Sequence, residues 1–96
     1  MLTVDQIRNI VSKHIKNYNV KDAYLFGSYA KGKATEDSDV DILLSADSIT
    51  TYDNYYRLHE SLEKDLGKKV DLLTMDGINP RFFELIKNDR ISLYAA

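Results

Sequence analysis

Apolar and polar residues follow one another along this chain with two distinct periods. From Thr3 onward, apolar residues recur at the spacing of three and four that places them on one face of a helix. Thr3 and Gln6 also have the spacing of a capping box, which predicts that a helix begins here. The apolar positions of this first predicted helix are Ile7, Ile10, Val11, Ile15 and Tyr18.

Short apolar runs between the helical segments predict strands. The run Ala23–Phe26 is wholly apolar and ends at Gly27, as a buried strand would. The run Asp39–Ser45 alternates in its first half and is apolar in its second, which predicts a strand with its acidic end at the surface. A third strand is predicted at Lys68–Thr74, and Ile91–Ala95 has the character of a strand-like tail.

The remaining segments predict helices and turns. Residues 28–32 are too few for more than one turn of helix. Tyr52–Leu66 has leucines on one face and Gly67 at the position after its end, and Asn79 and Pro80 supply an N-cap and a first helical residue for a short helix. We therefore expect an α/β (α+β) fold, a small mixed sheet flanked by helices, in one domain spanning residues 1–96. Periodicity alone leaves strand order and direction open.

Composition narrows the possible functions. The 96 residues are 44% hydrophobic with a net charge of -2, which argues against a general nucleic-acid binder. Residues 1–33 carry six Lys or Arg against two Asp or Glu, whereas residues 34–56 carry six Asp or Glu and no Lys or Arg. There is no cysteine, and no apolar run approaches the length that crosses a membrane. A cytoplasmic protein without direct nucleic-acid binding is the expectation.

Three aspartates are candidate metal ligands. Side chains two residues apart in a strand project from the same face, so Asp39 and Asp41 can share one site. Asp71 can reach that site if its strand lies beside theirs. Carboxylates gathered in this way repel one another, and a divalent cation with a preference for oxygen ligands, Mg²⁺ or Mn²⁺, neutralises them.

A candidate phosphate-binding turn precedes these aspartates. Gly27 permits close backbone approach, Ser28 offers a hydroxyl and an N–H at the start of a helical turn, and Lys31 adds positive charge. A nucleoside triphosphate would bridge this turn and the aspartates, with its phosphates at the turn and its metal ions at the carboxylates. This arrangement is typical of two-metal phosphoryl transfer.

The stretch GSYAKGKATEDSDVDILL, followed by KKVDLLT, resembles the signature of the DNA polymerase β nucleotidyltransferase superfamily. It is most similar to the minimal nucleotidyltransferases (MNT), which are often encoded with a HEPN-domain toxin. The resemblance implies that Asp39 and Asp41 bind two Mg²⁺ ions and that Asp71 completes the catalytic one. It also implies that Gly27 and Ser28 hold the β- and γ-phosphates of ATP. Transfer of AMP to a hydroxyl of a HEPN toxin, in an antitoxin role, is the expected activity.

Other interpretations stay open from the sequence. The domain could mask a partner by stoichiometric contact without catalysis, or it could modify a small molecule or an RNA end. Many relatives carry arginine at the position of Lys31, and lysine lacks the two-pronged geometry of a guanidinium. Tyr52, Tyr55 and Tyr56 are predicted to lie in the core or an interface, the Phe82–Phe83 pair in the core. His14 and His59 are predicted to be ordinary helix-surface residues.

Overall fold

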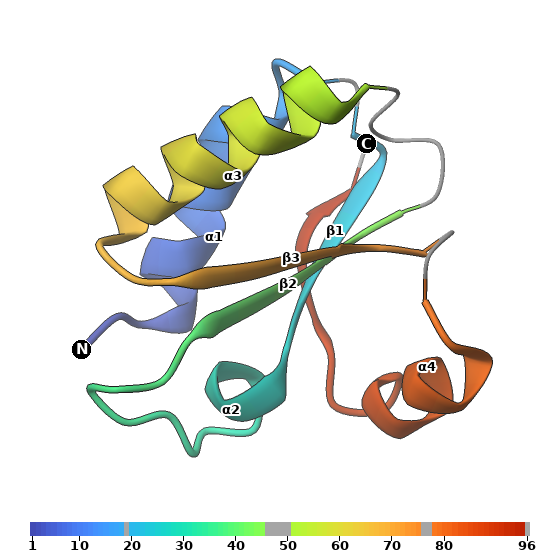
Figure 1. Ribbon diagram of the computed structural model, residues 1–96. Coiled ribbons are helices and arrows are strands. Elements are labelled where there is room, and N and C mark those ends of the chain that lie inside the picture. Colours follow the sequence, from blue (N-terminus) through green and yellow to red (C-terminus); the bar gives the residue numbers. More distant parts are fainter. Residues whose placement is uncertain (19, 46–50, 76–77, 96) are drawn as a thin grey trace.

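A computed structural model of the chain contains one four-stranded mixed sheet with helices on both faces (Figure 1). It describes residues 1–95 except 19, 46–50 and 76–77. Within these residues the elements are α1 (Val4–Ile15), β1 (Asp22–Phe26), α2 (Gly27–Ala30), β2 (Val40–Leu44), α3 (Tyr52–Leu66), β3 (Val70–Thr74), α4 (Pro80–Ile86) and β4 (Ile91–Ala95).

The strands lie side by side in the order β3-β2-β1-β4. Strand β1 is antiparallel to both of its neighbours, whereas β2 and β3 are parallel. Parallel strands need a long crossover, and α3 provides it between β2 and β3. The sheet is therefore mixed, and β3 and β4 form its two edges.

Local signals in the sequence explain where the long helices begin and end. The side chain of Thr3 accepts a hydrogen bond from the Gln6 N–H, and the side chain of Gln6 accepts one from the Thr3 N–H, so the predicted capping box is confirmed. Helix α3 ends at Gly67, whose φ of 68° is the left-handed conformation that a helix terminus favours.

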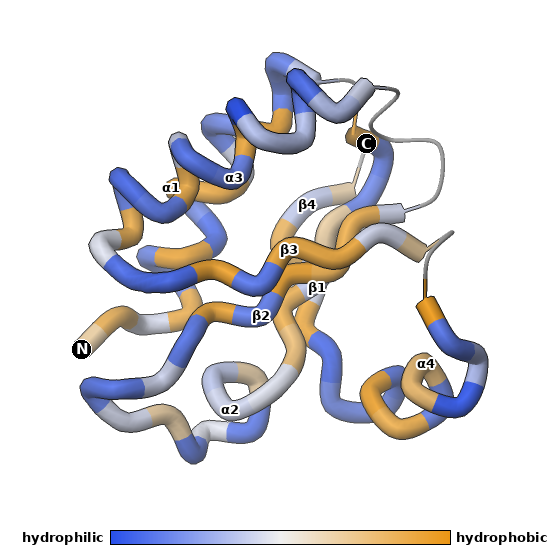
Figure 2. The backbone as a smooth tube through the Cα atoms, in the orientation of Figure 1, coloured by the Kyte–Doolittle hydropathy of each residue, from blue (hydrophilic) through white to orange (hydrophobic). Residues whose placement is uncertain are grey.

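The main hydrophobic core lies between the sheet and the pair α1 and α3. Figure 2 shows apolar residues along the strands and polar residues on the outward sides of these two helices. The helices contribute apolar side chains at the predicted spacing, and all six are at most 5% exposed. These residues are Ile7, Val11, Ile15, Leu58, Leu62 and Leu66.

A smaller apolar cluster covers part of the opposite face of the sheet. Phe26, Leu43 and Ile86 form its buried centre, and the rings of Phe82 and Phe83 on α4 pack against them. The prediction that this phenylalanine pair serves core packing is confirmed. The opposite face is thus covered beside α4, and Asp71 and Leu73 of β3 are exposed on it.

Most predicted elements are confirmed, with differences at their ends. The strand predicted from Asp39 begins at Val40, so Asp39 lies immediately before β2 rather than in it. The strand predicted from Lys68 begins at Val70, and the tail Ile91–Ala95 is a full edge strand paired with β1. None of the helices in the described part of the chain has the length and apolar composition that a membrane crossing requires.

Candidate active site

Parallel pairing of β2 and β3 brings two of the three predicted metal ligands together. Asp41 and Asp71 are register partners on these adjacent strands, and their side chains share a hydrogen bond. The pKa of Asp41 is raised from 3.8 to about 6, first by burial, then by the hydrogen bond and charge of Asp71, and last by the charge of Asp39. Below about pH 6 a proton is therefore shared between these two carboxyl groups, and at higher pH both are charged.

The turn between β1 and α2 lies directly against this pair. Gly27 has a φ of 72°, and a Cβ atom at this position would lie 2.1 Å from Oδ2 of Asp41. The sequence predicted a glycine here for the approach of phosphate. The structure adds a second reason, because the carboxyl group of Asp41 occupies the space that any side chain at position 27 would need.

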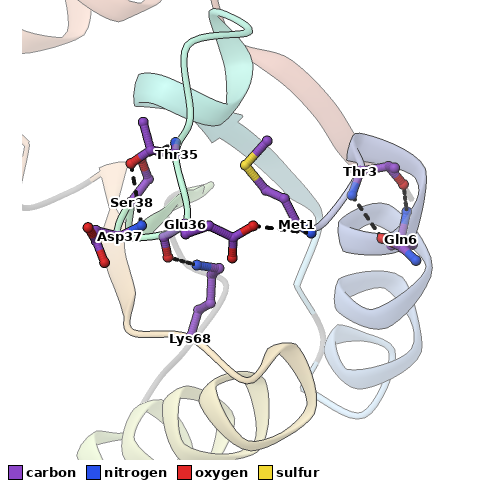
Figure 3. A network of polar contacts seen from close by, with 8 residues as sticks. All are labelled: Met1, Thr3, Gln6, Thr35, Glu36, Asp37, Ser38 and Lys68. Atoms are coloured by element: carbon purple, nitrogen blue, oxygen red, sulfur yellow. Dashed lines mark hydrogen bonds and ion pairs between the residues drawn. The ribbon is translucent and has the colours of Figure 1, made fainter.

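The segment that leads into β2 is fixed by its own polar contacts (Figure 3). The N–H of Thr35 donates to the Ser38 hydroxyl at 2.8 Å, and the N–H of Ser38 donates to the Thr35 carbonyl at 3.1 Å. Lys68, which follows α3, donates to the Glu36 carbonyl. The turn therefore tethers the backbone immediately before Asp39.

Asp39 stands at the edge of the carboxylate pair. It is partly buried and lies close enough for its charge to raise the pKa of Asp41. Over the described residues, however, no three Asp, Glu, His or Cys side chains are already gathered into a metal-ligand cluster. The contacting pair Asp41 and Asp71, with Asp39 beside it, is what the structure shows. Joint metal binding by all three stays a prediction.

The donor chemistry of these aspartates fits Mg²⁺. All three offer carboxylate oxygens, which Mg²⁺ prefers. The pKa of Asp41 is raised first by burial and further by Asp71 and Asp39, so the charged form of this group lacks a compensating positive charge. A divalent cation would replace the shared proton. Asp39, Asp41 and Asp71 are the residues that would hold it.

The predicted phosphate-binding residues lie on α2 and just after it. Ser28 is partly buried in the first turn of α2, which has no side-chain cap from Phe26. Lys31 is exposed at the end of α2, and its N–H donates to the Gly27 carbonyl at 3.1 Å. Helix α2 packs against β2, the strand of Asp41. These positions are compatible with the predicted role in phosphate binding, which stays a prediction.

Two residues that the sequence placed on helix surfaces have specific partners instead. Nε2 of His14 lies 2.5 Å from Oδ2 of Asp65, which joins α1 to α3 and lowers the pKa of Asp65. Nε2 of His59 lies 2.8 Å from the Val70 carbonyl. Both histidines lie on helices with partly exposed side chains, as predicted, but their partners on other elements were not predicted.

The three tyrosines at the start of α3 differ in their surroundings. Tyr55 packs against the main core, and its hydroxyl donates to the Leu72 carbonyl at 2.5 Å. Tyr52 and Tyr56 are 81% and 59% exposed. The prediction of core packing is therefore confirmed for Tyr55, and the other two rings are surface residues of this chain.

Binding of a divalent cation is expected to weaken as the pH falls through about 6. A proton on Asp41 competes with the metal ion, so the apparent affinity for Mn²⁺ should fall by up to about tenfold for each pH unit below this value and level off above pH 7. Electron paramagnetic resonance of free Mn²⁺, measured between pH 5 and 8, tests this. An affinity that stays constant over this range in protein that remains folded would contradict it.

The arrangement matches a known family over almost the whole chain. The model of the family "Polymerase beta, Nucleotidyltransferase" matches residues 5–96. The chain belongs to the polymerase β nucleotidyltransferase family. It is an enzyme of the nucleotidyltransferase class, and the resemblance proposed from the Gly-Ser and Asp-x-Asp motifs is confirmed.

Two archaeal relatives within this family are similar along most of their length. Protein MJ1379 of Methanocaldococcus jannaschii is 44% identical over 98 residues, which cover 95% of this chain and 98% of that protein. The protein adenylyltransferase MntA of Thermococcus cleftensis is 42% identical over 77 residues, which cover 76% of this chain and 78% of that protein. This nucleotidyltransferase therefore has relatives that are named for adenylyl transfer to proteins.

Solved structures confirm the nucleotidyltransferase fold. A candidate minimal nucleotidyltransferase is 30% identical with a TM-score of 0.80 and covers 94% of this chain and 95% of that one. A toxin–antitoxin with AMP-PNP gives the same TM-score at 23% identity and covers 93% of this chain and 73% of that one. A complex of a tri-AMPylated HEPN toxin of Shewanella oneidensis with its MNT antitoxin gives 0.74 at 20% identity, with 98% and 74% coverage. At these two lower identities the likeness shows the fold alone.

Proposed function

We propose that this nucleotidyltransferase transfers AMP from Mg²⁺-bound ATP to a hydroxyl group of a protein, and that the acceptor is a HEPN-domain toxin. The observation that carries the proposal is the contact of Asp41 with Asp71 on adjacent strands, directly over Gly27. The relative MntA, named a protein adenylyltransferase, and the structural neighbour with a tri-AMPylated toxin support the choice of group and acceptor.

Each residue of the site has a defined task in this reaction. Asp39 and Asp41 would hold two Mg²⁺ ions, and Asp71 would hold one of them and accept the proton of the attacking hydroxyl. The backbone and hydroxyl of the Gly27–Ser28 turn would bind the β- and γ-phosphates, with Lys31 adding positive charge. Bound Mg²⁺ lowers the pKa of the hydroxyl and neutralises the charge that develops on pyrophosphate.

The bonds that change follow from this placement. The acceptor oxygen forms a bond to the α-phosphorus of ATP while the bond from that phosphorus to the pyrophosphate oxygen breaks. The hydroxyl proton passes to the carboxylate of Asp71, and pyrophosphate leaves. The products are free pyrophosphate and a protein that carries AMP through a phosphodiester bond.

We also place the enzyme in the cytoplasm, because this compartment supplies ATP and is reducing.

Transfer of label from α-phosphate-labelled ATP tests the proposal. With Mg²⁺ and a lysate of the source organism, we expect one strongly labelled protein with the native chain and none with the double variant Asp39→Ala/Asp41→Ala. Mass spectrometry of the labelled protein should show a HEPN-domain sequence with AMP on a hydroxyl side chain. Label that appears only in small molecules or RNA would overturn the protein acceptor.

The same double variant separates modification from masking. If neutralisation of the toxin requires AMP transfer, cells that express the toxin should survive with the native chain and die with Asp39→Ala/Asp41→Ala. Co-purification of the variant with the toxin shows that the variant is folded and still binds. Full protection by a variant that transfers no label would establish stoichiometric masking instead.

A further inference from the structure

Strand β3, which carries Asp71, is an edge strand: among the described residues, no strand pairs with its side away from β2. In a parallel pair, alternate residues direct both backbone groups to the partner strand, and the residues between them direct theirs away. The carbonyl of Lys69 accepts from the Val40 N–H at 2.9 Å, so residues 69 and 71 face β2. Val70 and Leu72, on either side of Asp71, therefore turn their N–H and carbonyl groups to the free edge.

Side chains of α3 bind these outward backbone groups. Tyr55, His59 and Glu63 are each four residues apart and so lie on one face of the helix. The Tyr55 hydroxyl donates to the Leu72 carbonyl at 2.5 Å, and Nε2 of His59 lies 2.8 Å from the Val70 carbonyl, which makes this nitrogen the donor. The carboxylate of Glu63 accepts from the N–H of Val70 at 2.9 Å.

The three side chains also support one another. The rings of Tyr55 and His59 are parallel to within 1°, with their centroids 6.3 Å apart. Nε2 of His59 lies 3.5 Å from Oε2 of Glu63. The pKa of Tyr55 is raised by burial and then by the charges of Tyr56 and Asp71, so its hydroxyl remains a donor at neutral pH. Tyr55, His59 and Glu63 therefore form a clamp, which holds the backbone of β3 on both sides of Asp71.

We infer that Tyr55 and His59 are positioning residues that hold the β3 backbone on both sides of Asp71 and thereby keep its carboxylate against Asp41. The inference rests on the proposed function, in which Asp71 binds metal and accepts the acceptor proton. A shift of about 1 Å in a reacting group costs up to about 10²-fold in rate. Loss of one bond of the clamp should therefore reduce the rate of transfer more than it reduces binding of ATP.

The opposite edge of the sheet provides a structural control. Ser12 of α1 donates to the Leu93 carbonyl at 3.0 Å, and Nε of Arg8 donates to the Ser92 carbonyl at 3.2 Å. These bonds also fix an edge strand, but β4 carries none of the candidate catalytic residues. A loss of activity that arises only from a looser sheet should therefore appear in Ser12→Ala as well.

The test compares Tyr55→Phe with the control Tyr56→Phe. Tyr56 is the next residue in the chain and is 59% exposed, so the control removes the same hydroxyl group from a surface residue. We expect kcat for AMP transfer to fall about tenfold to a hundredfold in Tyr55→Phe, with KM for ATP changed less than about twofold. Tyr56→Phe and Ser12→Ala should keep the native kcat. At position 59, Gln can still donate to the Val70 carbonyl, so His59→Gln should retain more activity than His59→Ala.

Binding of Mn²⁺ alone gives a readout that does not need catalysis. Tyr55→Phe should weaken Mn²⁺ binding about threefold to tenfold relative to Tyr56→Phe, because the carboxylate of Asp71 is no longer held in place. If the native chain binds Mn²⁺ but transfers no AMP, the proposed function fails and the Mn²⁺ affinities alone decide the inference. Equal Mn²⁺ affinities in Tyr55→Phe and Tyr56→Phe would overturn the inference. An equal fall in kcat in Tyr55→Phe, Tyr56→Phe and Ser12→Ala would also overturn it.

Discussion

Replacing Asp41 by asparagine is expected to abolish nucleotidyl transfer and, at the same time, to stabilise the folded chain at neutral pH. Asparagine has nearly the same size but no charge, so it cannot take over the proposed role of this carboxylate as a metal ligand. Metal ions supply several kcal/mol of transition-state stabilisation in phosphoryl transfer, so the rate should fall by about 10³-fold or more. Incorporation of label from α-phosphate-labelled ATP measures this loss.

The gain in stability follows from the pKa of Asp41. Burial, with Asp71 and Asp39, raises this pKa from 3.8 to about 6 in the folded chain. A carboxyl group of this kind stabilises the fold fully only below its unfolded pKa, and that contribution is lost as the pH rises through about 6. The pKa difference corresponds to at most about 3 kcal/mol at pH 7.5, and solvent screening of this partly exposed group reduces it to about 1–2 kcal/mol.

Thermal unfolding in the presence of a chelator tests this second effect. At pH 7.5 the unfolding temperature of Asp41→Asn should exceed that of the native chain by about 4–8 °C for each kcal/mol added to the free energy of unfolding. This difference should shrink as the pH falls toward 4. Asp37→Asn is the matched control, because Asp37 is an exposed residue of the preceding turn. It should change neither activity nor the unfolding temperature appreciably. A variant of Asp41 that is less stable than the native chain at pH 7.5 would contradict the repulsion between the aspartates.

Gly27→Ala is expected to remove most of the activity by displacing a carboxyl group on another strand. A Cβ at position 27 would lie 2.1 Å from Oδ2 and 3.0 Å from Cγ of Asp41. The side chain of Asp41 would have to rotate away from Asp71, and a displacement of about 1 Å or more costs about 10²-fold in rate. The φ of 72° adds about 1–2 kcal/mol of strain for alanine.

A second variant, Gly67→Ala, separates backbone strain from displacement of Asp41, the two expected effects of Gly27→Ala. Gly67 has nearly the same φ, 68°, but a Cβ there would meet no atom of the described residues within 4 Å. Its replacement should lower the free energy of unfolding by a similar strain term and leave the transfer rate unchanged. Both variants can be compared by chemical denaturation and by the rate of AMP transfer. Native activity in Gly27→Ala would show that Asp41 does not need its observed position.

The sequence predicted the elements of this fold well because their signals are local. The capping box at Thr3, the leucine spacing of α3 and Gly67 each depend on neighbours within a few residues, and the structure confirms them. The start of β2 was predicted one residue early, at Asp39, because a strand begins where pairing begins and the Val40 N–H makes the first bond to β3. Strand order could not be predicted, since it depends on contacts between distant segments.

The candidate site likewise combines local signals, which the sequence shows, with contacts between distant segments, which it does not. The spacing of Gly27, Asp39 and Asp41 was visible in the sequence, and Asp71 was named as a conditional partner. Its contact with Asp41 required the parallel pairing of β2 and β3, which periodicity does not reveal. The partners of Tyr55 and His59 were missed for a similar reason. Only the knowledge that β3 is an edge strand shows that its backbone needs donors from α3.

Both outer strands of the sheet have backbone groups bound by helix side chains. Tyr55, His59 and Glu63 bind the outward groups of β3, and Arg8 and Ser12 bind two carbonyls of β4. A further strand, from an extended peptide or a second copy, would have to displace the bonds on β3 before it could pair there. The fold therefore resists the edge-to-edge aggregation to which small open sheets are prone, and it favours association through side-chain surfaces over strand addition.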